Sequence, residues 1–134
     1  MRSMSLMLLA ATLGACTTGP EPGRTAGDQA HLDKLLAGKA PAAAISCLPH
    51  YRANDMVVID DHTVVFKDGR TVYRNDFQGG ACSNLGHGGY ALVTRSVTPG
   101  LCRGDIAEVF DTSSKMTVGS CVLGDFIPYT GPRR

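Results

Sequence analysis

The segment TVVFKDGRTVY, residues 63–73, constrains the fold of this chain more than any other feature of its sequence. Two runs rich in β-branched and aromatic residues flank the dipeptide Asp68-Gly69, and such runs favour extended backbone. An Asp-Gly dipeptide in this setting predicts a two-residue hairpin turn whose central residues adopt positive φ angles. We therefore expect a β-hairpin in which Lys67 pairs with Arg70 and the strands pair outward from there.

The side chains of this hairpin divide between two faces, because successive residues of a strand point in opposite directions. The pairing above puts Phe66 opposite Thr71, Val65 opposite Val72 and Val64 opposite Tyr73. One face is expected to look into the core, with Val64, Phe66, Thr71 and Tyr73. The other is expected to be wetter, with Thr63, Val65, Lys67, Arg70, Val72 and Arg74.

Four further segments have strand-like composition and are separated by turn-forming residues: Met56–Ile59, Tyr90–Ser96, Ile106–Phe110 and Thr117–Leu123. The last two flank residues 111–115 and predict a second hairpin. The sequence does not decide which face of this hairpin points inward. It is either the face with Ile106 and Phe110 or the face with Ala107 and Val109. Short strands at regular spacing are typical of a mainly β fold, and we expect a small antiparallel sandwich or barrel.

An apolar stretch near the N-terminus ends at a cysteine. Residues 6–15 follow Arg2 and make up about half of the ~20 residues that a membrane-spanning helix needs, so a secretory signal is the better interpretation. Its last residues, Leu13-Gly14-Ala15-Cys16, resemble the lipobox of bacterial lipoproteins. We expect residues 1–15 to be a lipoprotein signal peptide and Cys16 to be the lipid anchor; a plain secretion signal is the alternative. By the sorting rule of enterobacterial lipoproteins, an aspartate after the lipidated cysteine retains the protein in the inner membrane. Thr17 follows Cys16 here, so we expect the outer membrane, with the chain facing the periplasm.

The other four cysteines are Cys47, Cys82, Cys102 and Cys121. An even number in an exported chain predicts two disulfides, because the periplasm is oxidising. No C-x-x-C pair is present, which argues against a zinc site. Three connectivities are possible. We favour Cys82–Cys102, which would close a glycine-rich loop, and Cys47–Cys121, which would tie the first strand to the last.

Residues 16–27 are rich in Gly, Pro and Thr and predict a flexible tether. Asp28 then stands where a helix N-cap would, three leucines follow at helical spacing, and Gly38 can end the helix. We expect a short helix at about residues 28–37. The length of the remainder fits one domain, so residues 28–134 are expected to form a single β-rich domain.

The formal net charge is +1 and the sequence contains no basic stripe, so we expect no nucleic-acid partner. The sequence contains no cofactor-binding or metal-binding motif, so we expect neither a cofactor nor a metal. The expected partners are the membrane, through the N-terminal lipid, and an envelope protein of unknown identity.

The segments IDDHTVVFKDGRTVYRNDFQGGACSNL, LCRGDIAEVFD and GSCVLGDFIPY resemble a family of small, uncharacterised proteobacterial lipoproteins. The resemblance spans about residues 45–129. It implies a folded unit and an envelope location, and it supplies no activity. The residues that carry it are Tyr73, Asn75, Cys82, Cys102, Gly104, Asp105, Cys121, Gly124 and Phe126.

Three polar motifs could carry chemistry. Asp60-Asp61-His62 could serve acid–base or metal chemistry, but a polar turn is the better interpretation. The glycines around His87 could form an anion-binding nest or present His87 beside a Cys82 nucleophile, although tight bends within a disulfide loop explain them better. Arg103-Gly104-Asp105 is interpreted as a turn in which Asp105 caps backbone amides.

We therefore expect a non-catalytic, lipid-anchored, periplasm-facing binding or structural module. One alternative is an inhibitor of a periplasmic or exogenous hydrolase, by analogy alone. A less favoured alternative is an enzyme that uses His87 or His62.

Overall fold

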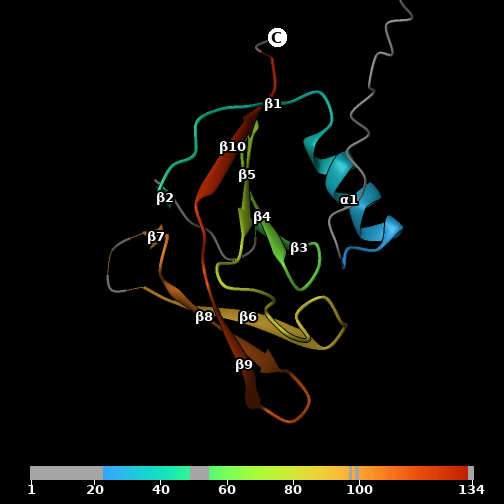
Figure 1. The fold of residues 1–134 in the computed structure, drawn as a ribbon, viewed down its shortest axis with the longest axis vertical. Helices are drawn as coiled ribbons and strands as arrows, with labels where there is room; N and C mark the ends of the chain where they lie inside the picture. Colours follow the sequence, from blue (N-terminus) through green and yellow to red (C-terminus); the bar gives the residue numbers. More distant parts are fainter. Residues whose placement is uncertain (1–22, 49–54, 97, 99, 133–134) are drawn as a thin grey trace, which may run out of the picture.

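The computed structural model describes residues 23–48, 55–96, 98 and 100–132; the predictions about the signal peptide and Cys16 lie outside these ranges. Within them, the chain forms one helix and ten strands, all strand pairs being antiparallel (Figure 1). The elements are α1 (Ala26–Leu36), β1 (Ala40–Pro41), β2 (Cys47–Leu48), β3 (Met56–Val58), β4 (Thr63–Asp68), β5 (Thr71–Asp76), β6 (Tyr90–Arg95), β7 (Leu101–Cys102), β8 (Ile106–Asp111), β9 (Met116–Val122) and β10 (Phe126–Thr130).

The strands form three sheets. A five-stranded sheet has the order β1-β10-β5-β4-β3, a three-stranded sheet has the order β6-β8-β9, and β2 pairs with β7 in a two-stranded ribbon. The strands β6 and β8 run across the direction of β5 and β10 (Figure 1). The mainly β, antiparallel architecture with one short helix is as predicted, and each strand expected from the sequence is present within a residue or two.

The hairpin β4–β5 forms, but its pairing differs from the prediction. Asp68 pairs with Thr71 and Phe66 with Tyr73, so the two turn residues are Gly69 and Arg70. Gly69 has a φ of +56°, and Arg70 is not among the residues with positive φ. The predicted turn at Asp68-Gly69 would need a positive φ at both Asp68 and Gly69. Because the pairing shifts by two residues, an even number, every side chain keeps its predicted face.

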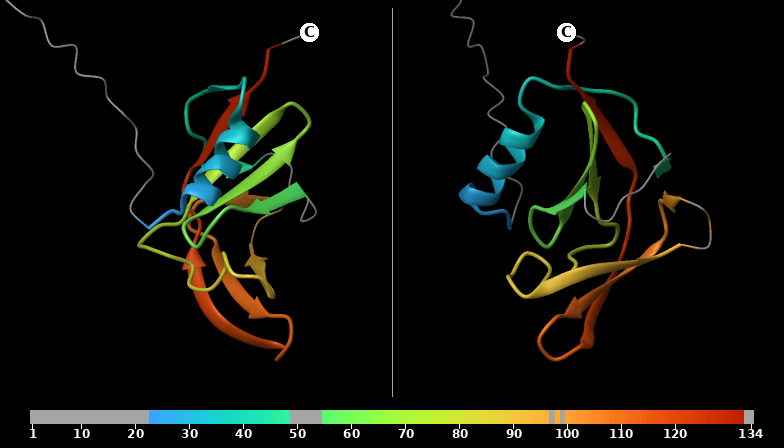
Figure 2. Two further views of the ribbon diagram at one scale, coloured as in Figure 1. Left: turned by 90° about the vertical axis from the view of Figure 1, so that its right-hand side faces the viewer. Right: turned by 180° about the vertical axis from the view of Figure 1, so that it is seen from behind.

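The face expected to be wetter is covered instead. Val65 and Val72 are buried there in a small core with Leu32 of α1 and Ile59, and Leu35 and Leu36 pack against it. Figure 2 shows α1 alongside the strands of the five-stranded sheet. The sheet is therefore buried on both faces. Val65 and Val72 supply the apolar surface on which α1 packs.

The helix begins two residues earlier than predicted. Its N-cap is Thr25, whose side chain accepts a hydrogen bond from the backbone amide of Asp28, and Asp28 lies in the first turn. Gly38, with a φ of +69°, follows the last turn as expected. Arg24 is buried and residues 26 and 27 belong to α1, so these residues are not part of a flexible tether; residues 16–22 of the predicted tether lie outside the described ranges.

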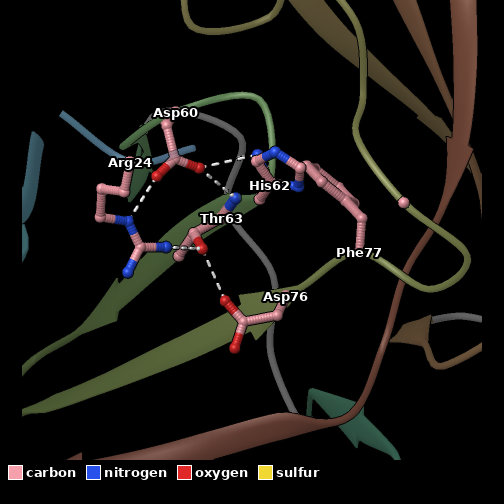
Figure 3. Close-up of a pocket in the computed structure, with 7 residues that line it drawn as sticks. Arg24, Asp60, His62, Thr63, Asp76 and Phe77 are labelled. Carbon is pink, nitrogen blue, oxygen red and sulfur yellow. Dashed lines mark hydrogen bonds and ion pairs between the residues drawn. The ribbon is translucent and has the colours of Figure 1, made fainter. Parts of the chain in front are cut away.

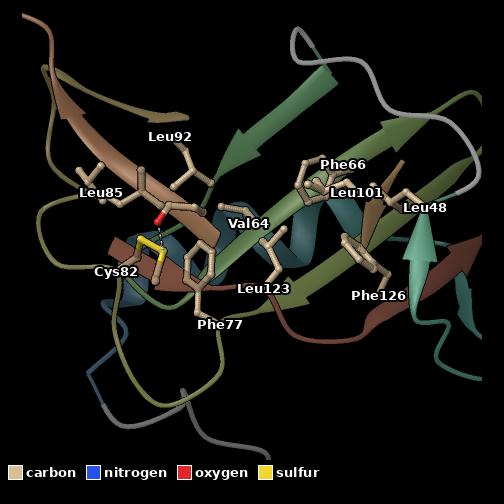
Figure 4. Packing of buried hydrophobic residues seen from close by; sticks show 13 residues of the cluster. Leu48, Val64, Phe66, Phe77, Cys82, Leu85, Leu92, Leu101, Leu123 and Phe126 are labelled. Atoms are coloured by element: carbon tan, nitrogen blue, oxygen red, sulfur yellow. Dashed lines mark hydrogen bonds between the residues drawn. A yellow bond between two sulfur atoms is a disulfide. The ribbon is translucent and has the colours of Figure 1, made fainter. Parts of the chain in front are cut away.

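The main core lies between the five-stranded and three-stranded sheets (Figure 4). The rings of Phe66 and Phe126 meet edge to face there, with their centroids 5.8 Å apart. On β8, Ala107 and Val109 are fully buried and Ile106 is 53% exposed, which decides the inward face of the second hairpin.

Strand β10 was not predicted, because Pro128 lies inside it and proline cannot donate to a β-ladder. The structure places it beside β1, a strand of only two residues, and pairs Pro128 with Tyr73 of β5. The entry to β10 is fixed by the buried side chain of Asn75, which donates to the carbonyl of Gly124 (2.7 Å) and accepts from its amide (3.1 Å).

Two disulfides form, as predicted, but the favoured connectivity is wrong. The bridges are Cys47–Cys102 and Cys82–Cys121. Cys47 lies directly opposite Cys102 in the β2–β7 ribbon, and Cys121 points from β9 into the core beside Cys82. The favoured pairing assumed that Cys121 stands on the last strand, which is in fact β10. In the chain-entropy model each bridge stabilises the fold by about 4 kcal/mol.

Candidate functional site

The turn Asp60-Asp61-His62 joins β3 to β4 and makes hydrogen bonds with three other segments of the chain. One carboxylate oxygen of Asp60 accepts hydrogen bonds from the backbone amides of His62 (2.7 Å) and Thr63 (2.8 Å). A short polar side chain that caps its own turn is a local device, which confirms that this motif is a turn.

The second carboxylate oxygen of Asp60 meets Arg24, which comes from the segment just before α1. The Nε of Arg24 lies 2.5 Å from Asp60 Oδ2, and the side chains are 3% and 8% exposed. Arg24 also donates to the hydroxyl of Thr63, which in turn donates to Asp76 Oδ1 at 2.6 Å. Figure 3 shows this chain of contacts, which ties the start of the helix to β4 and β5.

A cavity of about 340 Å³ lies against this network, with His62, Phe77 and Gly80 completing its wall. Its two carboxylates are both engaged. Asp60 bonds Arg24 and the backbone, and Asp76 bonds Thr63 and forms an ion pair with Arg74 at 2.9 Å. Every buried side-chain nitrogen and oxygen of the described residues has a hydrogen-bond partner. The acidic groups of this cavity therefore serve the fold.

Asp61 accepts hydrogen bonds from the glycine-rich loop that follows β5 and holds that loop against the turn. Its carboxylate accepts hydrogen bonds from the amides of Gly86 (2.6 Å) and Asn84 (3.3 Å), and its carbonyl accepts one from the amide of Cys82 (2.6 Å). Of the amides around His87 that were considered as an anion-binding nest, that of Gly86 thus binds a carboxylate of the protein itself. At Gly86 an added Cβ would come within 3.1 Å of the Asp60 backbone, so glycine allows the close approach.

This contact brings together the two histidines that the sequence singled out. His62 and His87 line a second cavity, of about 170 Å³, together with Asp28 and Thr25 from the start of α1. Within the described residues, no group of three or more His, Cys, Asp or Glu side chains is arranged to hold a metal ion. Cys82 is fully buried and bridged to Cys121, so it cannot pair with His87 as a nucleophile.

The turn Arg103-Gly104-Asp105 is structural in the way expected. Asp105 Oδ2 accepts a hydrogen bond from the amide of Cys102 (2.7 Å), and Gly104 adopts a φ of +90°. Arg103 forms an exposed ion pair with Asp125 at 3.3 Å.

An apolar surface lies on the outer side of the three-stranded sheet, which we call the outer face. Val93 and Ile106 are 43% and 53% exposed there, beside the exposed ion pair between Arg95 and Glu108. The register brings further partly exposed apolar side chains to the same face: Ala91, Phe110 and Val122. Large apolar side chains that remain in contact with water over several strands are typical of interaction surfaces.

Sequence reasoning missed Arg24, Thr63 and Asp76 as members of one network. Arg24 stands in a Gly- and Pro-rich segment that gives no sign of burial, and its partners come from β4 and β5. The one available signal was Thr25, a good N-cap residue, which would have placed the start of the helix next to Arg24.

None of the described residues belongs to a helix long and apolar enough to cross a membrane. Comparison of the chain with protein-family models, curated proteins and solved structures finds no match.

Proposed function

We propose that this chain is an outer-membrane lipoprotein, anchored by Cys16 and facing the periplasm, whose β-domain is a non-catalytic binding or structural module. The leader with Leu13-Gly14-Ala15-Cys16 supports the anchor. Two disulfides in a domain of this size fit an oxidising compartment. The seven residues from Cys16 to Pro22 would reach at most about 25 Å, which keeps the domain close to the bilayer.

The observation that carries the binding role is the outer face. Val93 and Ile106 expose apolar area on a sheet whose opposite side is packed into the core. A partner that covers this area would remove apolar surface from water, the main source of favourable free energy in protein association. Because of the proposed location, we expect the partner to be an envelope protein. A hydrolase that this domain inhibits would be one such partner.

The engagement of the polar side chains supports a non-catalytic role. Asp60, Asp61 and Asp76 each accept hydrogen bonds that hold turns or strands in place. Using any of them as an acid or base would compete with those bonds. The alternative of an enzyme rests on the cavity of about 170 Å³ that His62 and His87 line together.

The anchor is tested by feeding cells labelled palmitate. The wild-type chain should take up the label, and Cys16→Ser should remain unlabelled and uncleaved. Equal labelling of the two chains would refute the lipoprotein assignment.

The outer face is tested with a photo-crosslinking residue at position 106, with position 30, an exposed alanine on α1, as the control. We expect an adduct with an envelope protein from position 106 alone, and its loss when Val93→Asp is added. Equal adducts from both positions, or an adduct that Val93→Asp does not weaken, would contradict binding through this face.

A further inference from the structure

The two disulfides differ sharply in their contact with solvent. Cys82 and Cys121 are 0% and 8% exposed and belong to the main core. Cys47 is exposed and Cys102 is half-buried, in the β2–β7 ribbon at one side of the molecule (Figure 1). A thiol in solution must reach a sulfur before it can attack it, so the two bridges differ in the access that thiol–disulfide exchange requires.

The exposed bridge, Cys47–Cys102, joins the two short strands β2 and β7. Strands β2 and β7 contribute two residues each, and Cys47 faces Cys102 while Leu48 faces Leu101. The leucines are 2% and 1% exposed and belong to the main core. A further hydrogen bond joins the amide of Arg103 to the carbonyl of Ser46 at 2.6 Å. The ribbon thus keeps apolar and backbone contacts that do not depend on the sulfur–sulfur bond.

The surroundings of the two exposed sulfurs are not equivalent. The hydroxyl of Thr98 lies 3.7 Å from Cys102 Sγ, 3.3 Å from the carbonyl of Gly100 and 3.0 Å from the hydroxyl of Ser96, which can donate to it and leave its own hydrogen for an acceptor. A hydroxyl hydrogen rotates to suit its acceptor, and a thiolate is a stronger acceptor than a neutral carbonyl. Thr98 can therefore stabilise negative charge on Cys102, the less exposed residue, while Cys47 is the more exposed of the two.

We propose that Cys47–Cys102 is a thiol-exchange site, opened by a dithiol that attacks Cys47 and displaces Cys102, while Cys82–Cys121 stays closed. The proposal rests on the two bridges and on Thr98 beside one of them, and does not depend on the lipid anchor.

The exchange balances in two steps. A thiolate of the dithiol attacks Cys47 Sγ, the Cys47–Cys102 bond breaks, and its electron pair leaves on Cys102 Sγ, which takes up a proton. The second thiol of the dithiol, as its thiolate, then attacks the dithiol's own sulfur in the mixed disulfide and releases Cys47, which is protonated in turn. Two electrons and two protons pass to the bridge, and the dithiol becomes a disulfide.

The order of opening is tested on the full chain in detergent, without denaturant. Any thiol present at the start is blocked with N-ethylmaleimide, dithiothreitol is titrated in, and released thiols are labelled with iodoacetamide and mapped by peptide mass spectrometry. We expect label on Cys47 and Cys102 at dithiothreitol concentrations that leave Cys82 and Cys121 bridged. Label on all four together, or on Cys82 and Cys121 first, would overturn the proposal.

The direction of attack is tested with reduced glutathione, a monothiol that leaves a mixed disulfide to be mapped. We expect it on Cys47, formed about fivefold more slowly in Thr98→Val, the effect of one ordinary hydrogen bond. Thr98→Ser keeps the hydroxyl and should react at the wild-type rate. Glutathione on Cys102, or equal rates in the valine and serine variants, would contradict displacement of Cys102 beside Thr98.

Discussion

Replacing Arg24 by methionine should cost more stability than removing the charge of the exposed Arg103. Methionine keeps much of the apolar stem of arginine and deletes the guanidinium, which leaves the carboxylate of Asp60 inside the protein without its cation. Breaking a buried ion pair in this way costs about 3–5 kcal/mol. The backbone amides of His62 and Thr63 still solvate Asp60, so we expect the lower end, about 3 kcal/mol.

The control is another arginine–aspartate pair in the same chain. Arg103 and Asp125 are 56% and 41% exposed, and an exposed pair contributes about 0.2–1 kcal/mol. Arg103→Met should therefore lower the free energy of unfolding by well under half as much as Arg24→Met. Both are measured by urea denaturation of the full chain with its disulfides intact.

A double variant separates the buried charge from lost packing. In Arg24→Met/Asp60→Asn, the asparagine oxygen can accept the same two backbone hydrogen bonds and no charge remains unpaired. We expect this variant to be more stable than Arg24→Met alone. Equal losses for Arg24→Met and Arg103→Met, or a double variant less stable than the single one, would refute the reasoning.

Three further substitutions test other parts of the structure. Gly69→Val should destabilise the domain by about 1–3 kcal/mol, because a β-branched residue is strained at a φ of +56°, whereas Gly69→Asn should cost clearly less in the same urea titration. Gly124→Ala should cost about 3 kcal/mol or more, or prevent folding, since its Cβ would lie 2.2 Å from the carbonyl oxygen of Asp76; a thermal melt close to wild type would be incompatible with that contact. Hydrogen bonds from the side chain and backbone of Ser113, and from the backbone of Ser114, lower the pKa of Asp111 to about 2 from 3.8, so ionised Asp111 stabilises the fold above its unfolded pKa and loses this effect as pH falls toward 2. Asp111→Asn should show a smaller loss of stability between about pH 4 and pH 2, and an unchanged pH dependence would contradict the assigned bonds.

The sequence by itself determined the local elements. Alternating β-branched residues around Gly69 specify two strands and a tight turn, and the three leucines of α1 specify a helix face. These patterns reflect the preferences of neighbouring residues, so they can be recognised without knowing what packs on them. Asp105 as a cap and the polar turn at Asp60 belong to the same class, because each of these carboxylates bonds an amide three residues away or closer.

The tertiary structure decided which elements meet. The cysteine pairs were ambiguous because an even count fixes the number of bridges and leaves their partners to the fold. The pairing of β10 with β5, despite Pro128, depends on Asn75 and Gly124, 49 positions apart in the sequence.

The candidate site followed the same division. Asp60, Asp61 and His62 were recognisable as a polar turn, but only the docking of α1 and the glycine-rich loop brings His62 to the cavity of His87 and buries Arg24 against Asp60. Local pattern is set by propensity and spacing along the chain. Burial of a charge and the partner of a sulfur are set by contacts between distant segments, which form only when the sheets pack.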